Sequence, residues 1–212
     1  MKKFADREDA AKRLLELMPI EKMRNEAWEI VAVSVGGVEL AAYLNGRMQL
    51  PLDILLSAPI VAPNNEECEI ARICETEEIV IHEQLCDAFD IQVDYVYGEA
   101  SRRHEEKILS DMYHYRKGRH FEPKRGKSVL LVDEGSETGL KMMLALKAIF
   151  AQQPKAVYIA VPVLPEETLD ALEPLVDDIY YIYDIENYKE TPCYYERLDT
   201  VGLESIEKIL NS

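Results

Sequence analysis

Cysteine is scarce in this sequence, and no long apolar run is present. The 212 residues include only four cysteines, at positions 68, 74, 86 and 193, and no two of them form a Cys-x-x-Cys pair. This spacing offers neither a zinc site nor a disulfide framework, so we expect reduced thiols. No stretch approaches the roughly 20 apolar residues of a membrane-spanning helix. The start, Met1-Lys2-Lys3, leads into a charged segment, so we expect no secretory signal, a cytoplasmic location and no membrane partner.

Positive charge is also in short supply. Lysine and arginine together number 24, against 40 aspartates and glutamates, which gives a formal net charge of −16. The surface of such a protein repels the phosphates of a nucleic acid, and we expect no nucleic-acid partner. A small phosphorylated ligand is still compatible with this charge, because backbone N–H groups at a helix start hold a phosphate whatever the net charge.

Helices and strands alternate along most of the chain. An N-terminal helix is expected over residues 6–18, capped by Asp6 and ended by Pro19. Apolar, β-branched runs predict strands, and apolar residues spaced three and four apart predict helices. The expected strands span 29–35, 52–56, 128–132, 156–161 and 179–183, and the expected helices span 38–44 (closed near Gly46), 138–150, 166–175 and 203–210. This alternation is typical of an α/β fold with a mostly parallel sheet flanked by helices on both faces.

The segment over residues 59–92 breaks this pattern. The elements expected from there onward are a loop at Pro59, Pro63 and Asn64-Asn65, a hairpin of short strands at 68–74 and 78–82, a long amphipathic helix at 93–117 and a basic loop at 116–127. The length of the chain suits one domain. We therefore expect a single domain over residues 1–212, with a small hood at about 59–92 within it.

The strongest chemical signal follows the expected strand over 128–132. Two acids, Asp133 and Glu134, come directly after it, and Gly135-Ser136-Glu137-Thr138-Gly139 then leads into a helix. In a parallel sheet, ligands bind outside the carboxyl ends of the strands. Free N–H groups and the dipole at the helix start favour a phosphate there. The two acids are suited to the hydroxyls of a sugar or to a hydrated Mg²⁺.

These residues resemble the phosphoribosyl-pyrophosphate motif of type I phosphoribosyltransferases, in which an apolar strand leads to two acids, three variable residues and Thr-Gly. The resemblance extends along nearly the whole chain and is nearest to a bacterial group known as predicted phosphoribosyltransferases. The other matching segments are Phe4-Ala5-Asp6-Arg7, Val31-Ala32-Val33-Ser34-Val35-Gly36-Gly37-Val38, Pro51-Leu52-Asp53-Ile54, Val161-Pro162-Val163-Leu164-Pro165-Glu166-Glu167-Thr168 and Tyr194-Tyr195-Glu196. Several matches in the correct order are more specific than one loop.

The resemblance implies a reaction in which a nitrogenous base displaces pyrophosphate from an activated ribose with the aid of Mg²⁺. By position, Asp133 and Glu134 would hold the ribose hydroxyls and the Mg²⁺, and Glu137 stands where some relatives place a general base. Glu137 is equally well explained as a solvated loop acid. The residues implied in binding the phosphorylated ribose are Gly135, Ser136, Thr138, Gly139, Leu140 and Lys141 of the phosphate loop and Val35, Gly36 and Gly37 of the pyrophosphate loop. The resemblance also implies a homodimer, for which the long helix is a candidate interface.

Two cations of the family pattern are missing on the side of the leaving pyrophosphate. Val35 stands where a basic residue should precede Gly-Gly, and Leu56-Ser57-Ala58 stands where relatives have an Arg-Lys pair. At the end of the phosphate loop, Lys141 replaces the usual Thr or Ser. A developing diphosphate is costly to stabilise without cations, because charge-assisted hydrogen bonds are the strong ones.

Basic residues elsewhere offer two ways to compensate. Arg102, Arg103 and Lys107 lie together on the expected long helix, although acids interleave with them, as on a solvated helix face. The basic residues over 116–120 are a candidate lid over the site. The sequence leaves both alternatives open.

Three functional hypotheses follow from these residues. The first is a phosphoribosyltransferase acting on a nitrogenous base that the sequence does not identify, since the hood is its least patterned segment. The second is a relative that binds phosphoribosyl pyrophosphate or a nucleotide without turnover, as a sensor or interaction protein, which the missing cations favour. The third is a flavodoxin-like binding domain with no phosphoribosyl link, because fold alone does not fix function.

Overall fold

A parallel sheet lies at the centre of the protein. The structure, a computed structural model, describes Lys2–Asn211, and within this range the sheet has five strands in the order β2-β1-β6-β7-β9. Its strands are β1 (Trp28–Ala32), β2 (Leu52–Ile54), β6 (Ser128–Val132), β7 (Ala156–Ala160) and β9 (Asp178–Tyr180), and every neighbouring pair is parallel. The predicted α/β fold with a mostly parallel sheet is therefore confirmed.

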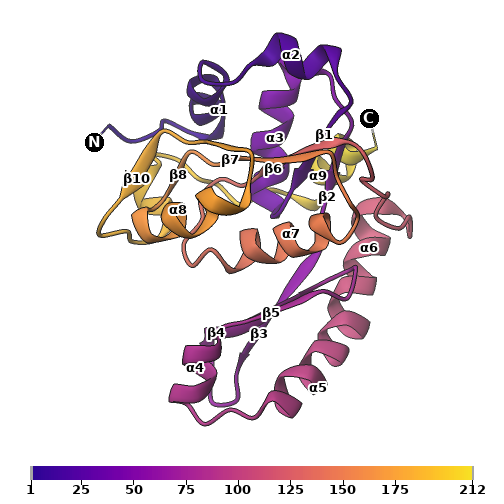
Figure 1. The fold of residues 1–212 in the computed structure, drawn as a ribbon, viewed down its shortest axis with the longest axis vertical. Coiled ribbons are helices and arrows are strands. Elements are labelled where there is room, and N and C mark those ends of the chain that lie inside the picture. Colours follow the sequence, from indigo (N-terminus) through magenta and orange to yellow (C-terminus); the bar gives the residue numbers. More distant parts are fainter. Residues whose placement is uncertain (1, 212) are drawn as a thin grey trace.

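Helices cover both faces of this sheet (Figure 1). On one face lie α1 (Arg7–Leu15), α2 (Ile20–Asn25), α3 (Val35–Met48) and α9 (Leu203–Leu210), and on the other lie α7 (Leu140–Phe150) and α8 (Glu166–Leu172). Side chains alternate between the two faces, since Ile30 and Leu130 pack in the core on the α3 side, and Val31 and Leu131 pack in the core on the α7 side. Burial on both faces explains why β1 and β6 are apolar almost throughout.

The register of the two central strands brings their carboxyl ends together. β1 and β6 pair from Trp28 with Ser128 to Ala32 with Val132, so both strands end at the same level. The Val33 N–H then donates to the Val132 carbonyl at 3.0 Å. The segments that follow, which carry the two predicted ligand-binding loops, therefore start side by side.

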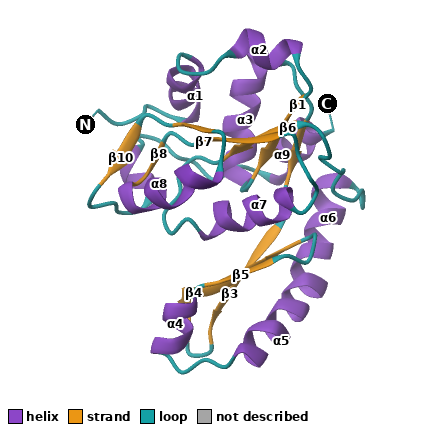
Figure 2. Ribbon diagram, in the orientation of Figure 1, coloured by secondary structure: helices purple, strands orange, loops and turns teal. Residues whose placement is uncertain are grey.

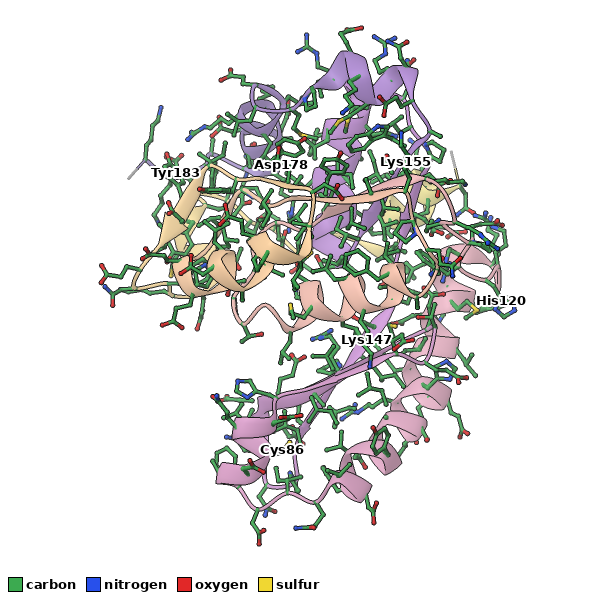
Figure 3. All side chains as sticks on the ribbon, viewed as in Figure 1. Cys86, His120, Lys147, Lys155, Asp178 and Tyr183 are labelled. Atoms are coloured by element: carbon green, nitrogen blue, oxygen red, sulfur yellow. The ribbon has the colours of Figure 1, made fainter. Side chains whose placement is uncertain are left out.

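The hood is a small antiparallel sheet attached below α7. Its strands are β3 (Ser57–Ala62), β4 (Asn65–Cys74) and β5 (Ile79–Ile81), and α4 (Glu83–Ala88) follows them. Figure 2 shows these strands enclosed between α4 and a long helix, which consists of α5 (Val93–Arg103), a π-helical turn (His104–Ile108) and α6 (Leu109–Arg116). Lys147 of α7 lies between α7 and the strands of the hood (Figure 3). Its Nζ donates to the Ile79 carbonyl at 2.9 Å.

Several predicted boundaries were wrong for local reasons. Pro59 lies inside β3 rather than in a loop. β3 is an edge strand, and an edge strand tolerates proline because only one of its sides forms hydrogen bonds within the sheet. The strand expected over 29–35 stops at Ala32, because Ser34 caps α3 through the Gly37 N–H. Gly46 does not end α3, which continues to Met48 and ends where Gln49 is left-handed.

The C-terminal third adds a short parallel ladder. The strand expected over 179–183 is two strands, β9 and β10 (Tyr183–Ile185), and β10 pairs with β8 (Val163–Pro165). A 3₁₀ turn (Thr191–Tyr194) follows and returns the chain toward the end of β6. All four cysteines are free thiols. Between Lys2 and Asn211, no helix is both long enough and apolar enough to cross a membrane.

Candidate functional site

Ser34 and Asp133 connect the ends of the two central strands. The Ser34 Oγ donates to Asp133 Oδ1 at 2.5 Å and accepts the N–H of Gly37 at 2.9 Å. Asp133 Oδ1 also accepts the N–H of Glu134 at 2.9 Å, and the side chain of Asp133 is only 1 % exposed. Asp133 therefore holds the start of α3 against the end of β6.

Lys141 supplies the cation opposite Asp133. Its Nζ lies 3.2 Å from Asp133 Oδ2, on the oxygen that Ser34 does not contact. Lys141 belongs to the first turn of α7, and its side chain is 37 % exposed. Both carboxylate oxygens of Asp133 thus have partners, and the ammonium is the part of this pair that reaches solvent.

Glu134 has a second cation, Arg7 of α1. Arg7 Nε donates to Glu134 Oε2 at 2.6 Å, and Arg7 Nη1 donates to Glu39 Oε2 at 3.0 Å and to the Asp199 carbonyl at 2.9 Å. Burial raises the pKa of Glu134, and the Arg7 guanidinium partly offsets this rise. The Tyr195 hydroxyl donates to the Glu134 backbone carbonyl at 2.7 Å. Three other parts of the chain, α1, α3 and the C-terminal segment, therefore converge on the end of β6.

The phosphate loop opens onto a cavity of about 400 Å³. The described residues that line it are Glu69, Arg72, Glu134, Gly135, Ser136, Glu137, Thr138, Gly139, Lys141, Thr191, Pro192 and Leu198. Within the described chain, the backbone N–H groups of Glu137, Thr138, Gly139 and Lys141 have no acceptor. Gly139 has a φ of +72°, which favours glycine and turns the loop into the helix. The loop therefore presents several free donors at a helix start, the arrangement that holds a phosphate.

Glu137 attaches the C-terminal segment to this loop. Its Oε1 accepts the N–H of Thr191 at 2.9 Å, and the Thr191 Oγ1 lies 3.0 Å from the Tyr188 hydroxyl. A Cβ on Gly135 would lie 2.5 Å from Thr191 Cγ2, so only glycine permits this approach. The 3₁₀ turn therefore forms one wall of the cavity, and Glu137 lies between the phosphate loop and that wall.

Arg72 of β4 brings a cation that the sequence analysis missed. Its guanidinium makes two hydrogen bonds to Glu69, at 2.7 and 2.9 Å, and a third to Ser57 Oγ at 3.1 Å. Ser57 is one of the residues that stand in place of the family's basic pair. Arg72 could have been placed near Ser57 only from the register of the two strands, in which Pro59 of β3 pairs with Arg72 of β4.

Not every predicted residue faces the cavity. Asp133, Leu140, Val35, Gly36 and Gly37 are absent from the described lining. The three pyrophosphate-loop residues form the first turn of α3, where a Cβ on Gly36 would clash with the Glu134 carboxylate. Close packing against the end of β6 therefore accounts for glycine at this position.

The segment over 116–120, the candidate lid, does not line the cavity at the loop. Arg116 is 2 % exposed and forms an ion pair with Glu75, and the loop after it is tied to the far end of α7, where Lys124 N–H donates to Gln152 Oε1 at 2.9 Å. Figure 3 places His120 at that far end, away from the phosphate loop. On the long helix, Arg102 forms ion pairs with Glu99 and Glu106. This is the arrangement expected if these basic residues belong to a solvated helix face.

A metal site at the two acids has little support from the donor set. Between Lys2 and Asn211, no group of three or more His, Cys, Asp or Glu side chains is placed to hold a metal ion. The carboxylates of Asp133 and Glu134 already contact Lys141 and Arg7. The Mg²⁺ expected at these two acids stays a prediction.

Comparison with known proteins supports the resemblance drawn from the sequence. No protein-family model matches the chain. Two curated Mycobacterium tuberculosis proteins, each named "Putative phosphoribosyl transferase", are 25 % identical over 183 residues, or 84 % of this chain. The chain spans only 40 % of the length of these relatives. The predicted resemblance to phosphoribosyltransferases is confirmed.

The fold has a solved counterpart of nearly the same extent. The crystal structure of TT1426 from Thermus thermophilus superposes with a TM-score of 0.79 at 28 % identity, covering 99 % of this chain and 98 % of that one. The overall fold, over nearly the whole chain, therefore recurs in another protein. A hypoxanthine-guanine phosphoribosyltransferase from Bacillus anthracis is a more distant likeness, with a TM-score of 0.49 at 13 % identity over 93 % of this chain and 94 % of that one.

Proposed function

We propose that the chain is a phosphoribosyltransferase that binds a phosphorylated ribose at the 133–141 loop and transfers phosphoribose to a nitrogenous base. The observation that carries this proposal is the cavity at the loop, which is lined by residues with free backbone N–H groups and also by Arg72 and Lys141. Such donors hold a phosphate, and the two cations suit further anionic oxygens. The names of the Mycobacterium tuberculosis relatives point to the same activity.

Each part of the ligand has a matching part of the cavity. The 5′-phosphate would accept hydrogen bonds from the N–H groups of 137–139 and Lys141. Glu134, which lines the cavity, would accept hydrogen bonds from a ribose hydroxyl. Asp133 would act through Lys141, which it holds in place. Arg72 would contact the diphosphate that leaves.

The reaction would be a displacement at C1 of the ribose. A nitrogen lone pair of the base forms the new C1–N bond, the C1–O bond to the diphosphate breaks, and its electron pair leaves with the diphosphate. The base loses its proton to solvent or to a nearby acceptor. Cations at the leaving oxygens and the negative charge of Glu134 near the cationic ribose stabilise this charge separation.

Calorimetric titration tests the binding half of this proposal. We expect phosphoribosyl pyrophosphate to bind more tightly than ribose 5-phosphate, because Arg72 contacts only the former. Arg72→Gln should weaken phosphoribosyl pyrophosphate binding about tenfold or more and leave ribose 5-phosphate unchanged. Arg102→Gln, on the solvated face of the long helix, is the matched control and should behave as wild type. No binding of either ligand would remove the phosphoribosyl function.

Turnover is tested separately with a panel of nitrogenous bases. Product formation from at least one base, lost in Asp133→Asn, is the expected result, since the change removes the counter-ion of Lys141. Binding with no product from any base would leave a phosphoribosyl-binding protein that is not an enzyme.

The assembly and location of the protein are further proposals. The long helix exposes large apolar side chains, among them Tyr97, Leu109 and Tyr113, which supports the predicted homodimer through this helix. Light scattering after size-exclusion chromatography should give twice the chain mass, and Tyr113→Glu should reduce it to one. The single domain over 1–212 and the cytoplasmic location stay predictions.

A further inference from the structure

The two acids at the end of β6 each contact a different cation. Asp133 faces Lys141 at 3.2 Å, and Glu134 faces Arg7 at 2.6 Å. The charge of Asp133 is therefore balanced by Lys141 before any ligand arrives, whereas Arg7 serves both Glu134 and Glu39. Only one of these cations, Lys141, lines the cavity, whereas Arg7 is 8 % exposed and lies behind Glu134.

A divalent metal does not fit beside these acids as they stand. Mg²⁺ requires oxygen ligands in octahedral geometry at about 2.0–2.1 Å. Asp133 Oδ1 already accepts from Ser34 and from the Glu134 N–H, and its other oxygen faces the ammonium of Lys141. A metal ion at Asp133 would thus have to displace Lys141 or endure its repulsion at close range.

Lys141 is placed to supply the positive charge that a metal ion would otherwise bring to the ligand. Its ammonium has three N–H donors, and Asp133 takes one of them, which leaves two for ligand oxygens on the cavity side. It stands at the helix start, next to the free N–H groups of the phosphate loop. Asp133 fixes the ammonium there, and the ammonium in turn cancels the repulsion between Asp133 and an anionic ligand.

We propose that Lys141 is a built-in counter-ion that replaces a protein-bound divalent metal, so that phosphorylated ribose ligands bind at the 133–141 loop without Mg²⁺. This inference rests on the proposed function, because it concerns the same ligand and the same loop. It also gives a role to a residue that departs from the family pattern, where Thr or Ser is usual.

The test is calorimetric titration with phosphoribosyl pyrophosphate, once with excess EDTA and once with millimolar Mg²⁺. Wild type should bind with a dissociation constant that differs less than about threefold between the two conditions, since the cation is covalently part of the chain. Lys141→Thr should bind about tenfold or more weakly in EDTA and recover with Mg²⁺, because it loses a charge-assisted contact and frees Asp133. Lys141→Arg keeps the charge and should stay independent of Mg²⁺.

Lys155→Thr is the matched control, since it removes an equal charge from an exposed ion pair with Glu26 away from the loop. Wild-type binding that requires Mg²⁺ would overturn this inference and leave the proposed function standing. A Lys141→Thr variant that binds as tightly in EDTA as wild type would also overturn it. No binding under either condition would instead remove the proposed function itself. If Lys141→Thr does not fold, as judged by circular dichroism, the wild-type comparison decides alone.

Discussion

Arg7 and Glu134 stand 127 residues apart in the chain, yet their side chains form an ion pair with 2.6 Å between Nε and Oε2. Arg7 is almost fully buried and also contacts Glu39 and the Asp199 carbonyl. The guanidinium thereby joins α1, α3, the end of β6 and the C-terminal segment. The candidate site is assembled on this contact, although Arg7 itself does not touch the cavity.

Replacing Arg7 by methionine should destabilise the protein substantially. Removal of one partner of a buried ion pair leaves Glu134 uncompensated, at a cost of about 2–4 kcal/mol in the free energy of unfolding. The double variant Arg7→Met, Glu134→Gln should recover part of this loss, because the more buried of the two carboxylates that Arg7 contacts is then neutral and only the partly exposed Glu39 loses its cation. Urea denaturation measures both. Arg197→Met removes an exposed arginine that pairs with Asp6 and should change stability little. Equal losses in the two single arginine variants would contradict this account.

The three glycines of α3 should respond differently to alanine. A Cβ on Gly37 would lie 2.7 Å from the Val132 carbonyl oxygen, which is backbone, so Gly37→Ala should cost about 1–3 kcal/mol of stability. A Cβ on Gly36 would meet only the end of the Glu134 side chain, which can turn aside at the expense of Arg7, so its cost should be smaller. Gly46 has nothing within 4 Å, and Gly46→Ala should stabilise by about 0.5–1 kcal/mol. Thermal unfolding ranks the three, and a different order would contradict the close packing of α3 on β6.

Local patterns were enough to predict part of the fold from the sequence. The strand over 128–132 and the helix over 203–210 were predicted with the bounds that β6 and α9 have. Both are bounded by clear changes in polarity along the sequence. The hood was harder, because Pro59 was interpreted as a loop residue although an edge strand accepts proline.

The site shows the same division between local and long-range information. The loop after β6 was singled out because its acids, glycines and helix start are neighbours in sequence, and its role in binding phosphate stays a prediction. Arg7 and Arg72 were not, since their positions depend on packing across the chain and on the register of β3 with β4. Asp133 was expected to face a ligand, whereas it faces Ser34 and Lys141, and Asp133 is excluded from the described lining of the cavity. Residue type alone does not tell which of the two acids lines the cavity.

Asp53 gives a pH dependence of stability. Burial raises its pKa above the ordinary value of 3.8, and the nearby charges of Arg116, Lys124 and Arg119 offset this only in part. Glu75, which shares Arg116 with it, limits that compensation. The raised pKa means that the ionised carboxylate is less favourable in the folded state, so its contribution to stability is full below 3.8 and is lost as the pH rises through the folded pKa.

The matching variant is Asp53→Asn, which does not titrate. Its free energy of unfolding should increase relative to wild type as the pH rises from about 4 to 7, because only wild type ionises a buried group in that range. Urea denaturation at several pH values measures the difference between the two curves. A constant difference over this range would mean that the Asp53 pKa is the same in the folded and unfolded protein.

Glu137 distinguishes an anchor from a general base. In the structure its Oε1 accepts the Thr191 N–H at 2.9 Å, so an anchoring role needs only an acceptor oxygen, whereas a general base needs a titratable one. Glu137→Gln keeps the acceptor and removes the basicity, and Glu137→Ala removes both.

If Glu137 is an anchor, the glutamine variant should bind phosphoribosyl pyrophosphate and form product like wild type. The alanine variant should then lose about 1 kcal/mol of stability together with the fixed position of the 3₁₀ turn. Loss of product formation in the glutamine variant, with ligand binding intact, would instead assign Glu137 to proton transfer. This variant keeps the acceptor oxygen and loses only the basicity.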